Sequence, residues 1–110
     1  MQFNFYIYAL FCDKTDDIVY VGMTQDPYWR QVGHKSSCKK DKRPLYKYFR
    51  KNKSIPRMEI IEVVRAEYRS QRVNDCERYW MHVLLDYGFN IQNQKWSIGK
   101  EIKHSILPVL

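Results

Sequence analysis

Six residues of this chain carry side chains that can move protons or stabilise negative charge. They are Tyr8, Tyr20, Arg30, His34, Glu77 and Asn90. An imidazole relays protons near neutral pH, and a guanidinium offers a planar fork of donors to phosphate oxygens. A single carboxylate can hold one Mg²⁺ ion that keeps several of its waters. Together these groups suit the cleavage of a phosphodiester bond, which needs a deprotonated nucleophile, a stabilised phosphate and help for the leaving oxygen.

Each residue also has an ordinary structural interpretation. Arg30 could be a solvated surface residue, His34 a structural one, Glu77 a partner of Arg78, and Asn90 a turn residue. Tyrosine is common in β-strands. A phenol with a pKa of about 10 is a poor base unless nearby cations lower that pKa. The residue types alone therefore do not distinguish a catalytic site from ordinary structural residues.

The two tyrosines belong to short motifs in separate apolar runs. The motifs are Tyr6-Ile7-Tyr8 and Tyr20-Val21-Gly22. The arginine and the histidine follow Tyr20 by ten and fourteen residues, and the glutamate and the asparagine come much later. In this order the chain resembles the GIY-YIG nuclease family over roughly Phe5 to Gln94, with Tyr6 standing where the family motif has glycine.

The resemblance implies a DNA endonuclease that depends on one Mg²⁺ ion, with Mn²⁺ as an alternative, and that uses a tyrosine as general base. Carried over to this sequence, Tyr8 takes a proton from the attacking water, while Tyr20 and His34 assist. The remaining residues implied are Arg30 at the phosphate, Glu77 at the metal and Asn90 as a brace.

Two apolar runs must position the tyrosines. Phe3–Phe11 predicts a strand buried on both faces, and Ile18–Met23 predicts a second strand after a polar turn, so that the two form a β-hairpin. Because side chains alternate along a strand, Tyr8 and Tyr20 point to the same side in a simple register, although a slip of one residue would separate them. Gly22 is interpreted as structural, since glycine at the end of a strand allows either a close approach of the backbone or a turn.

Helical signals follow the hairpin. Asp26-Pro27 predicts a helix start, and the helix would stack Arg30 and His34 on one face, despite the propensity cost of Gly33. A polar loop is expected over 36–42. A second helix should begin at Pro44, with Leu45, Tyr48 and Phe49 inward and Lys47, Arg50 and Lys51 outward. Met58–Val64 predicts a third strand.

The last helix has an apolar stripe with three- and four-residue spacing. Its members are Val73, Cys76, Trp80, Val83, Leu84 and Tyr87. Glu77 falls to one side of this stripe and is expected to lean into a cleft, and Gly88 is expected to end the helix. The predicted fold class is a small α/β (α+β) domain, GIY-YIG-like, with a central antiparallel sheet of about three strands flanked by helices.

Positive charge is concentrated in the middle of the chain. The formal net charge is +7, and such a basic segment favours polyanions through salt-sensitive contacts. The residues expected to bind nucleic acid are Lys35, Lys39, Lys40, Lys42, Arg43 and Lys47. The alternative interpretation is a solvated basic face without a partner.

Length and composition bound the organisation. At 110 residues with 45% hydrophobic content, we expect one nuclease-like domain over 1–94 and a tail over 95–110 that packs or seeks a partner. No membrane segment or export signal is expected, which favours an intracellular protein. The small size fits either a compact enzyme of a phage or mobile element or an excised domain. Cys12, Cys38 and Cys76 are widely spaced, so reduced thiols are expected rather than disulfides or zinc ligands.

Two alternatives remain open beside the endonuclease. The chain could be a nucleic-acid-binding module that keeps the fold without turnover, or the catalytic fragment of a longer site-specific nuclease. It could also act as a monomer or as a homodimer on DNA.

Overall fold

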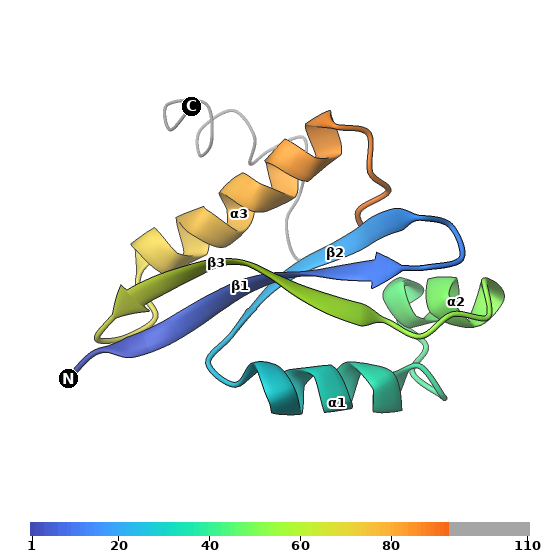
Figure 1. Cartoon of the computed structure of the whole chain (residues 1–110), viewed down its shortest axis with the longest axis horizontal. Coiled ribbons are helices and arrows are strands. Elements are labelled where there is room, and N and C mark those ends of the chain that lie inside the picture. The colour runs from blue at the N-terminus through green and yellow to red at the C-terminus, as the bar shows by residue number, and fades with distance from the viewer. Residues whose placement is uncertain (93–110) are drawn as a thin grey trace.

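The computed structural model of the protein describes residues 1–92, which form a three-stranded antiparallel sheet and three helices (Figure 1). The strands are β1 (Phe3–Cys12), β2 (Asp17–Thr24) and β3 (Arg57–Ala66). The helices are α1 (Pro27–Ser37), α2 (Pro44–Lys51) and α3 (Gln71–Asp86). This confirms the predicted α+β class with a three-stranded antiparallel sheet flanked by helices, and the strands exceed their predicted ranges by one to three residues. The tail expected over 95–110 lies outside the described residues.

β1 is the central strand, and the order across the sheet is β2-β1-β3. Tyr8 pairs with Gly22 and Leu10 with Tyr20, in a register that is regular from Tyr6 to Leu10. A bulge follows between Leu10 and Phe11, beyond the first motif. Because the register is regular where the motifs lie, Tyr8 and Tyr20 share one face of the sheet, as the sequence predicted.

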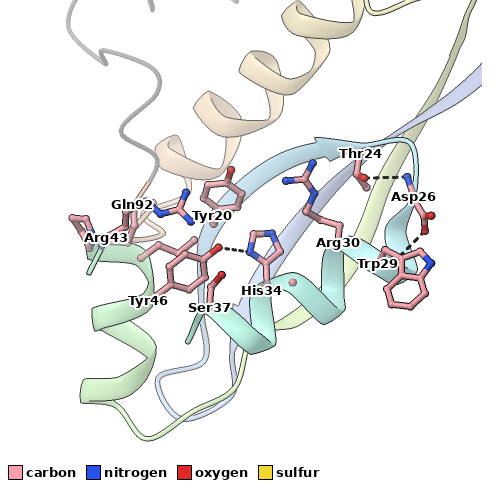
Figure 2. A pocket seen from close by; sticks show the side chains of 13 residues that line it. Tyr20, Thr24, Asp26, Trp29, Arg30, His34, Ser37, Arg43, Tyr46 and Gln92 are labelled. Atoms are coloured by element: carbon pink, nitrogen blue, oxygen red, sulfur yellow. Dashed lines mark hydrogen bonds between the residues drawn. The ribbon is translucent and has the colours of Figure 1, made fainter. Parts of the chain in front are cut away.

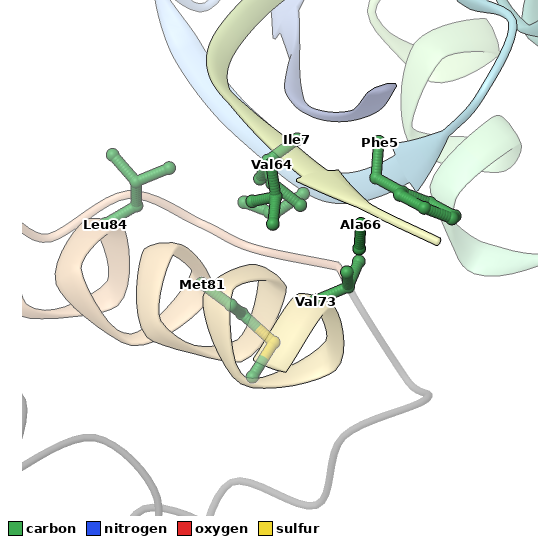
Figure 3. Close-up of a cluster of buried hydrophobic side chains, with 8 residues drawn as sticks. Phe5, Ile7, Val64, Ala66, Val73, Met81 and Leu84 are labelled. Carbon is green, nitrogen blue, oxygen red and sulfur yellow. The ribbon is translucent and has the colours of Figure 1, made fainter. Parts of the chain in front are cut away.

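The sheet is covered on both faces, with α3 on one side and α1 and α2 on the other (Figure 1). The core under α3 consists of Phe5, Ile7, Val21, Val64, Ala66, Val73, Met81 and Leu84 (Figure 3). The core on the opposite face consists of Tyr8, Leu10, Cys12, Val19, Leu45, Tyr46 and Phe49. Alternate residues of β1 thus enter different cores, which confirms a first strand buried on both faces. No helix within residues 1–92 is long and apolar enough to cross a membrane.

The start of α1 matches the sequence signal. The Asp26 side chain accepts a hydrogen bond of 3.2 Å from the Trp29 backbone N–H, and Pro27 is the first helical residue. The helix continues to Ser37, so the polar loop is shorter than expected. The backbone N–H of Cys38 still reaches the His34 carbonyl at 3.2 Å, which holds the last turn in place.

In α2, Leu45 and Phe49 are buried as predicted, but Tyr46 is buried as well. Arg50 is half-buried rather than pointing outward, because its guanidinium donates to the Cys38 carbonyl oxygen at 3.0 Å. This bond ties α2 back to the end of α1 and fixes the short connection between them.

The buried face of α3 differs from the predicted stripe. Its buried residues include Val73, Glu77 and Met81, which follow one another at intervals of four. Glu77 therefore lies within the buried stripe rather than beside it. Tyr87 is 79% exposed because it lies past the last helical residue. Gly88, with a φ of 93°, takes the left-handed conformation expected just after a helix end.

Candidate active site

His34 is held between two phenols. Its Nε2 lies 2.7 Å from the Tyr8 hydroxyl, and its Nδ1 lies 2.7 Å from the Tyr46 hydroxyl. A neutral imidazole donates from one nitrogen and accepts at the other. One phenol must therefore donate to the ring while the other accepts from it. The result is a continuous hydrogen-bonded chain from β1 through α1 to α2.

Tyr46 was not identified from the sequence, although it completes this chain. The inward positions of α2 were predicted from apolar spacing, which favoured Tyr48 instead. Tyr48 bonds to Thr15 at the β1–β2 turn, with 2.7 Å between the two oxygens. The sequence signal for Tyr46 was an aromatic residue directly after Leu45. In a helix as short as α2, two adjacent residues can both be buried.

Gly22 allows the two motif tyrosines to approach each other. A Cβ at this position would lie 2.5 Å from the Tyr8 ring and hydroxyl and 2.7 Å from the Tyr20 ring. The ring centroids of Tyr8 and Tyr20 are 6.1 Å apart, and that of His34 is within 5.7 Å of both. The structure thus confirms the predicted close approach at Gly22.

A cavity of about 630 Å³ opens over this cluster. Its wall comprises Tyr20, Thr24, Asp26, Trp29, Arg30, Gly33, His34, Ser37, Arg43, Pro44, Leu45, Tyr46 and Gln92. Figure 2 shows Arg43 toward one end and Trp29 at the other, with Tyr20, His34 and Arg30 between them. Tyr8 is only 1% exposed and does not line the cavity, so it lies behind Tyr20 and His34.

Two arginines line the cavity, and they differ in whether a carboxylate pairs with them. Arg43 is paired with Asp41 at 2.7 Å and lies 5.1 Å from the centre of the Tyr46 ring. No carboxylate within residues 1–92 pairs with the Arg30 side chain, which is exposed in the cavity wall. Arg30 is therefore the cation best able to accept an incoming phosphate.

The protein groups around the two motif tyrosines raise the phenol pKa values. Burial raises the pKa of Tyr8 well above its ordinary value, Tyr20 adds to that effect, and Arg30 opposes it. Burial also raises the pKa of Tyr20, with a further increase from the Glu77 carboxylate and an opposing effect of Arg30. Desolvation thus outweighs the nearby positive charge. Both tyrosines are protonated at neutral pH.

His34 is also uncharged at neutral pH. Burial lowers its pKa to about 4, and the positive charges of Arg30 and Arg43 act in the same direction. A neutral ring can accept a proton from one phenol while it donates to the other. This protonation state is the one that the hydrogen-bonded chain requires.

Glu77 is the residue whose surroundings differ most from the prediction. Its side chain is 2% exposed, it pairs with Arg69 at 3.3 Å, and it does not line the cavity. It nevertheless lies close enough to Tyr20 and Tyr8 to raise the pKa of both. A carboxylate is the right donor for Mg²⁺, but that ion retains several waters, and a sealed, paired side chain leaves no room for them. In this arrangement the residues do not fit a hydrated Mg²⁺ ion.

Asn90 lies at the end of the hairpin rather than in the cavity wall. Its backbone N–H donates to the Asp17 carboxylate at 3.1 Å, and its side chain is exposed. Gln92, two residues later, does line the cavity, and its backbone N–H donates to the Val19 carbonyl at 2.6 Å. No sequence pattern points to Gln92, because its position depends on how the chain after α3 returns to β2.

The predicted nucleic-acid-binding residues are all exposed, on the last part of α1, the connection to α2 and α2 itself. Of these, Arg43 is the one that also lines the cavity. Cys12, Cys38 and Cys76 are free thiols, as expected. No group of three or more His, Cys, Asp or Glu side chains within residues 1–92 is arranged to hold a metal ion.

Comparison with known proteins gives no match: no family model, curated protein or solved structure matches this chain.

Proposed function

We propose that the protein is a Mg²⁺-dependent DNA endonuclease of the GIY-YIG type, which hydrolyses phosphodiester bonds with a tyrosine as general base. One observation carries the proposal. His34 is bonded at 2.7 Å to both Tyr8 and Tyr46, at the wall of a cavity that is also lined by Tyr20 and by Arg30, with which no carboxylate of residues 1–92 pairs. These groups can bind a phosphate and move a proton next to it.

Phosphate binding would use the two arginines. The Arg30 guanidinium has no competing carboxylate among residues 1–92 and can donate to two phosphate oxygens at once. Arg43 is held in position by Asp41 and adds a second positive charge across the cavity. Since both cations lower the pKa of His34, a bound phosphate would offset them and make the ring a better proton acceptor.

The proton route follows the hydrogen-bonded chain. A Tyr8 phenolate formed in advance is disfavoured by burial. Tyr8 would instead donate its proton to His34 Nε2 while it takes a proton from the attacking water, and Nδ1–H would donate to the Tyr46 oxygen. The attacking water has to reach Tyr8 past the wall formed by Tyr20 and His34, which gives Tyr20 the assisting role.

Magnesium dependence and the role of Glu77 are part of the proposal. A Mg²⁺ ion would stabilise the negative charge of the phosphate and of the leaving oxygen. Glu77 could hold such an ion only after it separates from Arg69 and turns toward the cavity. The steps above are therefore assigned to protein groups alone.

Cleavage of supercoiled plasmid with Mg²⁺, beside an EDTA control, tests the activity directly. Glu77→Gln keeps the size of the side chain and should abolish cleavage while leaving DNA binding intact, since removal of an acid does not weaken attraction to phosphate. Arg69→Gln is the matched control, because it removes the ion pair but keeps the carboxylate. Near-normal turnover by Glu77→Gln would mean that Glu77 is a structural residue.

A binding module without turnover is the second candidate, and the burial of Glu77 together with its pairing to Arg69 favours it. Binding to DNA that is unaffected by EDTA, with no Mg²⁺- or Mn²⁺-dependent cleavage, would support this alternative. Under either function DNA is the proposed partner, bound by a monomer or by a homodimer. We also propose an intracellular protein of phage or mobile-element origin, either complete or the catalytic part of a longer nuclease.

A further inference from the structure

Two large aromatic side chains are exposed at the start of α1. Tyr28 is 67% and Trp29 65% exposed, and their ring centroids are 5.1 Å apart at an interplanar angle of 81°. Trp29 also lines the cavity and precedes Arg30 in the chain. An exposed indole at one end of the cavity provides a flat apolar surface that a ligand can cover.

The charges along the cavity differ between its two ends. Arg30 and Arg43 lie at its middle and at one end, whereas Asp26 lies with Trp29 at the other end (Figure 2). The Asp26 carboxylate already accepts a hydrogen bond from the first turn of α1. This helix end therefore does not attract a phosphate in the way that an uncapped one does. Phosphate is favoured beside the arginines and disfavoured beside Asp26.

A nucleic-acid strand matches both the arginines and the exposed indole. Its phosphates suit the arginines, and its bases have flat π-faces that stack on aromatic side chains. We propose that Trp29, supported by Tyr28, is a stacking site for an unpaired base of a nucleic-acid strand whose phosphate is held by Arg30. This inference rests on the proposed function and specifies the substrate class for the same site.

Stacking on Trp29 restricts the substrate. A base inside a duplex is covered on both faces by its neighbours, so it reaches an indole only after it leaves that stack. The inferred substrate is therefore single-stranded, flapped or frayed next to the bound phosphate. An intact blunt duplex offers the arginines its phosphates but offers Trp29 no free base.

The test compares the binding of a fluorescein-labelled single-stranded oligonucleotide with that of a blunt duplex of the same sequence, both in EDTA. Trp29→Ala should weaken single-strand affinity by roughly tenfold while changing duplex affinity by less than about twofold. Trp29→Phe keeps an aromatic ring and should retain most of the single-strand affinity. Tyr87→Ala, which removes a 79% exposed ring outside the cavity wall, should change neither affinity.

Equal losses on both probes, or no loss on either, would overturn the stacking site, as would a failure to bind any nucleic acid. Binding in EDTA is independent of catalysis. If Trp29→Ala weakens single-strand binding selectively but the protein cleaves no DNA with Mg²⁺, the nuclease proposal fails and the stacking site stands. If cleavage occurs and Trp29→Ala binds both probes normally, only the stacking site fails.

Discussion

Three hydroxyl- or nitrogen-bearing rings act as one unit in the candidate site. Tyr8, His34 and Tyr46 are connected by two hydrogen bonds of 2.7 Å, and all three are buried. Hydrogen bonds of this kind strengthen one another where water is excluded, and an unsatisfied member is costly. A change in any one of these rings therefore alters the protonation and orientation of the other two.

The two motif tyrosines should differ in how much their hydroxyls contribute. Tyr8→Phe removes the oxygen that is hydrogen-bonded to His34 Nε2 and should reduce the cleavage rate by about a hundredfold or more. Tyr20→Phe should cost less, because Tyr20 assists from the cavity wall. Single-turnover rates, with circular dichroism to verify folding, provide the measurement. A larger loss for Tyr20→Phe would transfer the proton-accepting role to the phenol that lines the cavity.

The pKa of His34 sets a prediction for pH dependence. In the folded protein this pKa is lowered to about 4, whereas an unfolded histidine has a pKa of about 6.5. The unfolded state therefore binds more protons between these two values, and the free energy of unfolding should fall as the pH is lowered from 6.5 to 4. Urea titrations across this range should show the fall, and it should be smaller in His34→Gln. Equal slopes in both proteins would mean that His34 is not buried in its neutral form.

At the scale of elements, the hairpin and α1 were predictable because their signals are local. Alternation along β1 and β2, the Asp26-Pro27 cap and the spacing from Arg30 to His34 each concern neighbours within a few residues. Tyr46 and the Glu77–Arg69 pair were not predictable in this way. They depend on how α2 and the β3–α3 connection pack against the sheet. On α3, apolar spacing placed Val73 and Leu84 in the core correctly but missed the burial of Glu77.

Two glycines provide a matched test of element packing. Gly22→Ala places a methyl group 2.5 Å from the Tyr8 hydroxyl in a buried position, so it should lower the free energy of unfolding by about 1–3 kcal/mol. Gly33→Ala meets no atom within 4 Å on α1, and it should raise that free energy by about 0.5–1 kcal/mol through helix propensity. Urea unfolding measures both. A stable Gly22→Ala would show that β2 and Tyr8 can move apart.

At the scale of the whole molecule, positive charge and the cavity lie on connected parts of the chain. The exposed lysines at the end of α1 and in the α1–α2 connection come shortly before Arg43, which lines the cavity. A net charge of +7 gives attraction to any polyanion, and local clustering gives it direction. Salt dependence is the property that reports on this distribution.

Binding to duplex DNA should weaken steeply with salt. Neutralising Lys39, Lys40 and Lys42 to glutamine should reduce the slope of log affinity against log salt by at most about three. The control variant combines Arg65→Gln on β3 with Arg72→Gln on α3, both at exposed positions. It should leave that slope nearly unchanged. If the lysine variant kept the original slope, the α1–α2 connection would be a solvated face that does not meet DNA.

The central position of β1 also determines when the site can come into existence. Pairing of β1 with β2 closes a short turn, whereas pairing of β1 with β3 closes a loop that contains both α1 and α2. Long loops close at a higher entropic cost and later in folding. The tyrosine hairpin should therefore form first, His34 and Tyr46 should join it next, and β3 should dock last. Val21→Ala should then slow folding, while Val64→Ala should mainly speed unfolding in stopped-flow experiments.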